Sequence, residues 1–164
     1  MSIPPLAHPG DLHYLMAHQV WARLHGDGTA TVGITQLGIQ LSGEVYMCRA
    51  KRVGTTLAQG GTVAVVELSK AVVAVKSPVS GSVVAVNEAL EEQPELVHRD
   101  PYGAGWIARL QLSGFAADQT ALLTGDAVAP AMAHHAWLHR LELVPATTPA
   151  AAPTPTPTPN DGTP

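Results

Sequence analysis

Cysteine is almost absent from this 164-residue chain, which has a single one, Cys48. One cysteine excludes an internal disulfide, and the apolar residues at 45–47 favour a small buried filler in a strand over a catalytic thiol. Charged residues are also few, at 13%, and the net charge is −4. Because no basic patch is present, we expect neither a nucleic acid nor an anionic membrane as a partner.

Motifs of independent catalysis are missing as well. The sequence has no Gly-x-Ser-x-Gly elbow, no phosphate-binding glycine loop and no dinucleotide-binding fingerprint. Among eight histidines, His135 and His139 have the i, i+4 spacing of two ligands on one helical face. No His-Glu-x-x-His arrangement and no cysteine pair supports a metal there. The sequence therefore predicts a protein that is not an enzyme and that holds no metal.

Signals for export or membrane insertion are also lacking. Residues 1–11 contain neither the basic region nor the apolar stretch of a secretory signal, and no apolar run is long enough to cross a bilayer. If the source is bacterial, we expect a cytoplasmic protein.

What the sequence does contain is a valine-rich stretch over residues 61–78, in which large and small residues alternate on both sides of Ser69 and Lys70. This alternation predicts two short strands on a common core. Since no Asn-Gly or Asp-Gly pair marks a two-residue turn, we expect a looser turn built on type I geometry. Lys70 would lie at the tip, either as an ordinary solvated residue or as an amine that a modifying enzyme reaches.

Further short elements are expected on both sides of this hairpin. Alternating segments predict strands at 20–24, 29–34, 44–49, 82–86 and 106–112. Trp21 would anchor the inner face of one sheet. A helical turn is expected at 35–41 with Thr35 as its cap, and a short helix at 87–97, broken near Pro94.

The two ends of the chain have a different character. Residues 1–12, with three prolines, predict a flexible lead. A C-terminal helix is expected from Pro130 to about Leu141, so that the domain spans residues 13–142. Residues 143–164 contain a Pro-Thr repeat and predict a disordered tail.

The hairpin resembles a known modification site. Glu67, Lys70 and Ala71, followed by Ser-Pro-Val-Ser-Gly at 77–81, are similar to the lipoylation hairpin of lipoyl and biotinyl carrier domains, and more specifically to that of the glycine cleavage system H protein family. Biotin acceptors usually have methionines beside the lysine, whereas Ser69 and Ala71 flank it here. Other motifs match the family in order and spacing across residues 13–142: His18, Trp21, 26–28, 32–35, 53–54, 86–91, 94–97 and 100–106.

The resemblance implies a fold and a cofactor. The fold would be mainly β, a lipoyl-type β-sandwich (barrel-sandwich hybrid) of two antiparallel sheets with short helices and a C-terminal helix. Lipoate would be bound covalently to Lys70 by a lipoate ligase or lipoyl transferase that recognises Glu67 and Ala71. His18 and Gln19 would belong to a surface on which the arm rests.

The resemblance also implies a cargo and partners. An aminomethyl group would be carried on reduced lipoate between enzymes resembling glycine decarboxylase, aminomethyltransferase and dihydrolipoyl dehydrogenase. A tethered intermediate reaches successive active sites at high effective concentration instead of diffusing away. The dithiolane would supply the thiol–disulfide chemistry, and the protein would supply position and a recognition surface.

Three departures from the family pattern leave the pathway open. The family's Glu-Ser-Val-Lys is Glu-Leu-Ser-Lys at 67–70, its His-Glu-Trp is His-Gln-Val-Trp at 18–21, and residues 72–75 lack the Ser-Asp-Leu that usually follows the lysine. One alternative is an H-like lipoate-binding protein of sulfur oxidation, which would serve a heterodisulfide-reductase-like complex. An alternative from another class is an unmodified β-sandwich that serves as an interaction module.

Overall fold

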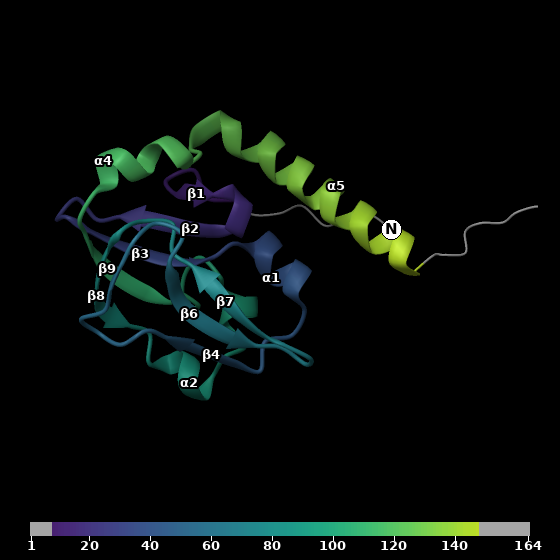
Figure 1. The fold of residues 1–164 in the computed structure, drawn as a ribbon, viewed down its shortest axis with the longest axis horizontal. Helices are drawn as coiled ribbons and strands as arrows, with labels where there is room; N and C mark the ends of the chain where they lie inside the picture. The colour runs from purple at the N-terminus through teal and green to yellow at the C-terminus, as the bar shows by residue number, and fades with distance from the viewer. Residues whose placement is uncertain (1–7, 148–164) are drawn as a thin grey trace, which may run out of the picture.

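The structure is a computed structural model that describes residues 8–147 (Figure 1). Its strands are β1 (His13–Leu15), β2 (Val20–Leu24), β3 (Thr29–Ile34), β4 (Met47–Ala50), β5 (Thr56–Leu57), β6 (Thr62–Glu67), β7 (Val72–Lys76), β8 (Gly81–Val86) and β9 (Ala108–Leu112). Its helices are η1 (Met16–His18), α1 (Gln36–Ser42), α2 (Ala89–Glu92), α3 (Leu96–Arg99), α4 (Phe115–Asp118), η2 (Gln119–Ala121), η3 (Gly125–Ala127) and α5 (Val128–Thr147).

The strands form two antiparallel sheets. Six strands pair in the order β1-β2-β3-β9-β8-β5, and three pair in the order β4-β6-β7. Short helices connect the strands, and α5 runs along one side of the molecule past β1 and α1 (Figure 1). The prediction of a mainly β protein with two antiparallel sheets, short helices and a C-terminal helix is therefore confirmed.

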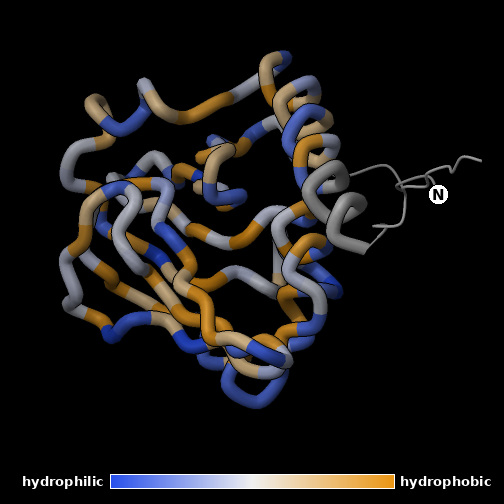
Figure 2. Tube along the Cα trace, turned by 45° about the vertical axis from the view of Figure 1, so that its right-hand side comes forward, coloured by the Kyte–Doolittle hydropathy of each residue, from blue (hydrophilic) through white to orange (hydrophobic). Residues whose placement is uncertain are grey.

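The main core lies between the two sheets. The strands are rich in hydrophobic residues (Figure 2), and the side chains that face inward bury one another. Val20 and Ala22 of β2 pack there against Val63, Val66 and Val83. Burial of these side chains provides the hydrophobic stabilisation that holds the sheets together.

Trp21 belongs to a second core on the other face of β2, so the prediction that it anchors the inner face of a sheet is wrong. Because side chains alternate along a strand, Trp21 points away from the face that Val20 and Ala22 share. It is fully buried against Tyr14, Leu37 and Met132. Its Nε1 donates to the carbonyl oxygens of Ile34, at 3.1 Å, and Pro101, at 3.2 Å. This second core attaches α5 to the larger sheet.

Gly33 faces Trp21 across the β2–β3 pair, and a side chain there has no space. A Cβ atom at position 33 would lie 2.5 Å from Cζ2 of Trp21. We expect Gly33→Ala to lower the free energy of unfolding by about 1–3 kcal/mol, as overpacked cores do, in urea titrations. Gly114→Ala is the matched control, since a Cβ at Gly114 meets no atom within 4 Å. Equal stability of the two variants would contradict this packing.

Two strands begin later than the sequence predicts. In each case a backbone N–H group donates to an acceptor outside the expected strand pairing. The strand expected at 44–49 begins at Met47, because the N–H of Val45 donates instead to Nε2 of His98, at 3.0 Å. The strand expected from 106 begins at Ala108, since the Trp106 N–H donates to Gly103 in a turn. The predicted cap of α1 is confirmed: Oγ1 of Thr35 accepts from the Gly38 N–H at 3.0 Å.

The described region overlaps both ends of the chain that the sequence predicts to be irregular. Leu12, the last residue of the predicted lead, is buried in the second core. Helix α5 extends to Thr147, into the first residues of the predicted tail. The rest of the predicted lead and tail, residues 1–7 and 148–164, lies outside the described residues.

Candidate functional site

The hairpin of β6 and β7 presents Lys70 at its tip. The two strands pair antiparallel up to Glu67 and Val72, and the Leu68 N–H donates to the Ala71 carbonyl at 2.8 Å. Only Ser69 and Lys70 lie between that bonded pair, so the turn is tighter than the loose one that was expected. Both residues are exposed.

The backbone of this turn agrees with the expected type I geometry. Among the residues described, Gln19 is the only non-glycine with a positive φ. Ser69 and Lys70 therefore have negative φ, which excludes the I′, II′ and II turns. The tip does not require glycine, so a lysine can occupy it without backbone strain.

Hydrogen bonds hold the base of the hairpin in place, while its tip is exposed. We call the bonds between Asp118 and Ser80 the Asp118 clamp. The Ser77 N–H donates to the Gly61 carbonyl at 2.7 Å, and the Gly60 N–H donates to the Ser77 carbonyl at 2.8 Å. The Ser80 N–H donates to the buried carboxylate of Asp118 at 2.7 Å, and its hydroxyl donates to the same carboxylate at 3.0 Å. Val63, Val66 and Val75 are buried in the main core. The strands thus hold the position of Lys70 without covering its amine.

The two predicted recognition residues lie beside Lys70. Glu67 ends β6 and Ala71 follows the turn, and both side chains are exposed. In the described part of the chain, neither Glu67 nor Lys70 forms a salt bridge. Beyond Ala71, Val72 is 65% exposed and Val73 42%. An enzyme that approaches Lys70 meets a free amine, one carboxylate and a small apolar surface.

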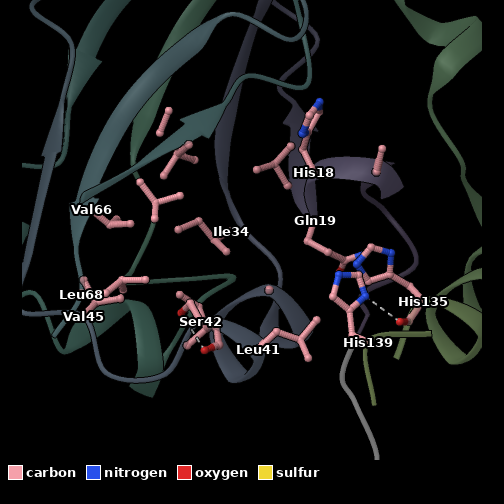
Figure 3. A pocket seen from close by; sticks show the side chains of 17 residues that line it. His18, Gln19, Ile34, Leu41, Ser42, Val45, Val66, Leu68, His135 and His139 are labelled. Atoms are coloured by element: carbon pink, nitrogen blue, oxygen red, sulfur yellow. Dashed lines mark hydrogen bonds between the residues drawn. The ribbon is translucent and has the colours of Figure 1, made fainter. Parts of the chain in front are cut away.

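A cavity of about 340 Å³ opens beside this hairpin (Figure 3). Its walls come from β6 and β7, from η1 and the start of β2, from α1 and from α5. Most of the lining is apolar; the residues are Ala17, His18, Gln19, Val20, Ile34, Gly38, Ile39, Leu41, Ser42, Val45, Val66, Leu68, Val73, Ala74, Val75, His135 and His139. An apolar space of this kind suits a flexible methylene chain attached at the hairpin tip.

His18 and Gln19, the two residues expected on an arm-resting surface, are both in the cavity wall. They differ in exposure, since His18 is exposed and Gln19 is 5% exposed. Nε2 of Gln19 donates to the carbonyl of Met16 at 2.9 Å, and its Oε1 accepts from the Thr35 hydroxyl at 2.6 Å. Gln19 therefore ties η1 to the cap of α1 and shapes the wall.

The hydrogen bonds of Gln19 require an amide. A carboxylate at position 19 has no donor for the Met16 carbonyl, and its burial would carry a desolvation cost. We expect Gln19→Glu to lower the free energy of unfolding by about 1–3 kcal/mol, measured by urea titration at pH 7. The matched control is Gln40→Glu on the exposed face of α1. If both variants unfold at the same urea concentration, the network does not depend on the amide.

Several contributors to the site were not predicted from the sequence. The α1 wall of the cavity and the Asp118 clamp give no local signal, because they act on residues distant in the chain. The i, i+4 spacing of His135 and His139 suggests only a metal pair, whereas the structure places both residues on the cavity wall. Within residues 8–139, no three His, Cys, Asp or Glu side chains gather as metal ligands.

Cys48 is the buried filler that its neighbours predict. It is 2% exposed, and burial raises the pKa of its thiol to about 12. The thiol is therefore protonated at neutral pH. Across residues 8–147, no helix combines the length and apolar character that a membrane span requires.

Comparisons with known proteins agree on one family. The family model described as glycine cleavage H-protein matches residues 12–135. A glycine cleavage system H protein of Psychrobacter cryohalolentis is 46% identical over 118 residues, which are 72% of this chain and 92% of the relative. One of Mycobacterium avium is 44% identical over 122 residues, with 73% and 92% covered.

A solved structure is similar as well. The crystal structure of a glycine cleavage system H protein from Mycobacterium marinum superposes with a TM-score of 0.59 at 34% identity. The likeness covers 65% of this chain and 87% of that one. It confirms the fold class predicted from the sequence.

Proposed function

The chain belongs to the glycine cleavage H-protein family, and from this premise we propose that it is a lipoylated carrier of the glycine cleavage system, with lipoate attached to Lys70. The observation that carries the proposal is the exposed amine of Lys70 at the tip of a hairpin whose base is clamped. A carrier needs an attachment point that an enzyme can reach and that keeps its place.

Attachment converts the Lys70 ammonium to a neutral amide. A lipoate ligase or lipoyl transferase would recognise the geometry of the tip together with Glu67 and Ala71. Both residues are exposed beside the lysine. Neither Ser69 nor Lys70 has a positive φ, so both side chains are presented without that backbone strain.

Lipoate supplies thiol–disulfide chemistry through its dithiolane, and the chain's own residues control where the arm rests. The cavity beside the hairpin is lined mainly by apolar side chains, among them Leu68, Val73 and Leu41. These groups would cover the methylenes of the arm between visits to partner enzymes. His18 and Gln19 would form part of that resting surface.

The cargo would be an aminomethyl group on the reduced arm. The partners of the carrier would be glycine decarboxylase, aminomethyltransferase and dihydrolipoyl dehydrogenase of the glycine cleavage system. Because the arm is tethered, each partner would meet the intermediate at a raised effective concentration. The relatives reported above are named as glycine cleavage system H proteins, which favours this cargo over that of a sulfur-oxidation carrier.

Reconstitution tests this proposal. The fully lipoylated protein, mixed with glycine decarboxylase and pyridoxal phosphate, should support exchange of labelled bicarbonate into the carboxyl group of glycine. The unlipoylated chain is the control and should give only the background rate. A lipoylated sample that fails to raise exchange above that background would contradict the glycine cleavage role and leave a carrier for another cargo.

A further inference from the structure

Three cationic side chains, those of Arg49, Lys51 and Arg52, line one pocket at an edge of the smaller sheet. The whole chain has only nine lysines and arginines and a net charge of −4, yet three of the nine lie within residues 49–52. All three are exposed. β4 is an outer strand of its sheet, beside β6, and α2 packs against it (Figure 1). We call these three residues the β4 cation cluster.

The β4 cation cluster has no neutralising partner in the described part of the chain. The two salt bridges among the described residues are formed by Arg23 and Arg109. Glu91 of α2 also lines the pocket, but it forms no salt bridge with the three cations. Charges of one sign that line the same cleft raise the local potential and attract a group of opposite charge. The pocket therefore suits an anionic group from outside the chain.

Strand pairing places the β4 cation cluster near the lysine hairpin. In the register of β4 and β6, Met47 is opposite Glu67 and Arg49 is opposite Val65. Arg49 thus lies two residues, or about 7 Å, along the sheet from the level of Glu67, which ends β6 just before the turn. A protein partner typically covers about 800 Å² of the surface that it binds, which is wider than this separation. An enzyme that reaches the hairpin tip can contact Arg49 as well.

We propose that the β4 cation cluster docks an acidic surface patch of an enzyme that acts on the lipoyl arm. The inference rests on the proposed lipoylation of Lys70 and adds the chemistry of the partner surface. Aspartate or glutamate side chains of the enzyme would enter the pocket and pair with the two guanidinium groups and the ammonium group.

An acidic protein surface fits the cluster better than a nucleic acid does. Three cations neutralise few phosphates, and the net charge of −4 repels a long polyanion. Complementary charges at a protein interface raise the rate of association and fix the orientation of the two proteins. A carrier that visits several enzymes needs fast encounters in one orientation, which places the arm at the active-site entrance.

Binding of the fully lipoylated chain to each of the three proposed partner enzymes, taken from the same organism, tests the inference. Isothermal titration at low and at high salt gives the Kd values. We expect at least one enzyme to bind with a Kd that rises about tenfold or more at high salt, because salt screens the charges. For that enzyme, Arg49→Gln should raise the Kd about threefold and Arg49→Glu about tenfold or more, since reversal adds repulsion to the lost attraction.

Arg99→Glu is the matched control for charge reversal. Arg99 is exposed at the end of α3 and does not line the pocket. This variant changes the net charge by the same amount, and its Kd should differ less than about twofold from that of the parent chain. Circular dichroism verifies that the variants fold, and mass spectrometry verifies that all samples are equally lipoylated.

Cross-linking identifies the contact directly. When Lys70 is lipoylated, Lys51 and Lys76 are the lysines that keep a free amine. A carbodiimide activates the carboxylates of the enzyme, and the amine of Lys51 then forms an amide bond while the corresponding urea is released. We expect peptide mapping to find Lys51 joined to an Asp or Glu of the enzyme. Lys51→Arg keeps the positive charge, so it should remove the cross-link and preserve binding.

Two outcomes overturn the inference while the carrier role stands. One is equal binding of Arg49→Glu and Arg99→Glu to every partner enzyme; if a single-stranded oligonucleotide then binds the parent chain but not Arg49→Glu, the cluster belongs to a nucleic-acid site. The other is the absence of a Lys51 cross-link with all three enzymes. Exchange supported by the parent chain reports the carrier role separately. A chain that carries no lipoyl group after ligase treatment would overturn that role, and this inference with it.

Discussion

Lys70→Arg should abolish lipoylation and reduce glycine–bicarbonate exchange at least about a hundredfold, to the background without carrier. Arginine keeps the positive charge, but its guanidinium is not acylated by a ligase that acts on a lysine amine. Without the arm, the effective concentration that tethering provides is lost. Mass spectrometry of the intact protein and the exchange assay measure the two effects.

The substitution should leave the fold intact, because Lys70 is exposed and forms no salt bridge among the described residues. We expect its free energy of unfolding to remain within about 0.5 kcal/mol of the parent chain. Lys51→Arg is the matched control for an exposed lysine elsewhere, and it should keep both lipoylation and exchange. If the Lys70→Arg variant still supports exchange, lipoate is attached to a residue other than Lys70.

Asp118→Ala should be the most destabilising of the single substitutions considered, lowering the free energy of unfolding by about 2–4 kcal/mol. Asp118 is 7% exposed, and its carboxylate accepts hydrogen bonds from the N–H and the hydroxyl of Ser80. Hydrogen bonds to a charged group are worth about 1.5–3 kcal/mol, and removal of the acceptor leaves the Ser80 N–H unpaired. Urea titration measures the loss.

The Asp118→Ala substitution should also loosen the β6–β7 hairpin. Ser80 lies in the loop between β7 and β8, so a looser loop should increase hydrogen exchange of the β7 backbone amides. Asp126→Ala, at an exposed carboxylate of the η3 turn, is the control and should change neither quantity appreciably. Stability and exchange identical to those of the control would show that the clamp contributes nothing to the hairpin.

The lysine hairpin and the α1 cap were predictable because their signals are local. Alternation of valine with smaller residues predicts β6 and β7. The turn is predicted at Ser69 and Lys70, where this pattern is interrupted. Thr35 caps α1 through a bond to Gly38, three residues away. Such interactions are encoded within a few positions of the chain.

The environments of Trp21 and Gln19 were not predictable in the same way. Whether Trp21 faces the main core or the helix depends on which sheet face α5 covers, and residues more than a hundred positions later decide that. Gln19 lines the cavity, but it is 5% exposed, and its amide is hydrogen-bonded to Met16 and to Thr35, which is distant in the sequence. Tertiary packing sets these environments, and periodicity alone does not contain it.

Lipoylation in vitro, followed by peptide mapping, is the most direct measurement. The chain has three lysines, Lys51, Lys70 and Lys76, so two of them serve as internal references. Incubation of the unmodified protein with a lipoate ligase, lipoate and ATP should place one lipoyl group on the Lys70 peptide and none on the other two. An unmodified Lys70 peptide, or modification of the exposed Lys51 to the same extent, would show that the hairpin tip is not the attachment site.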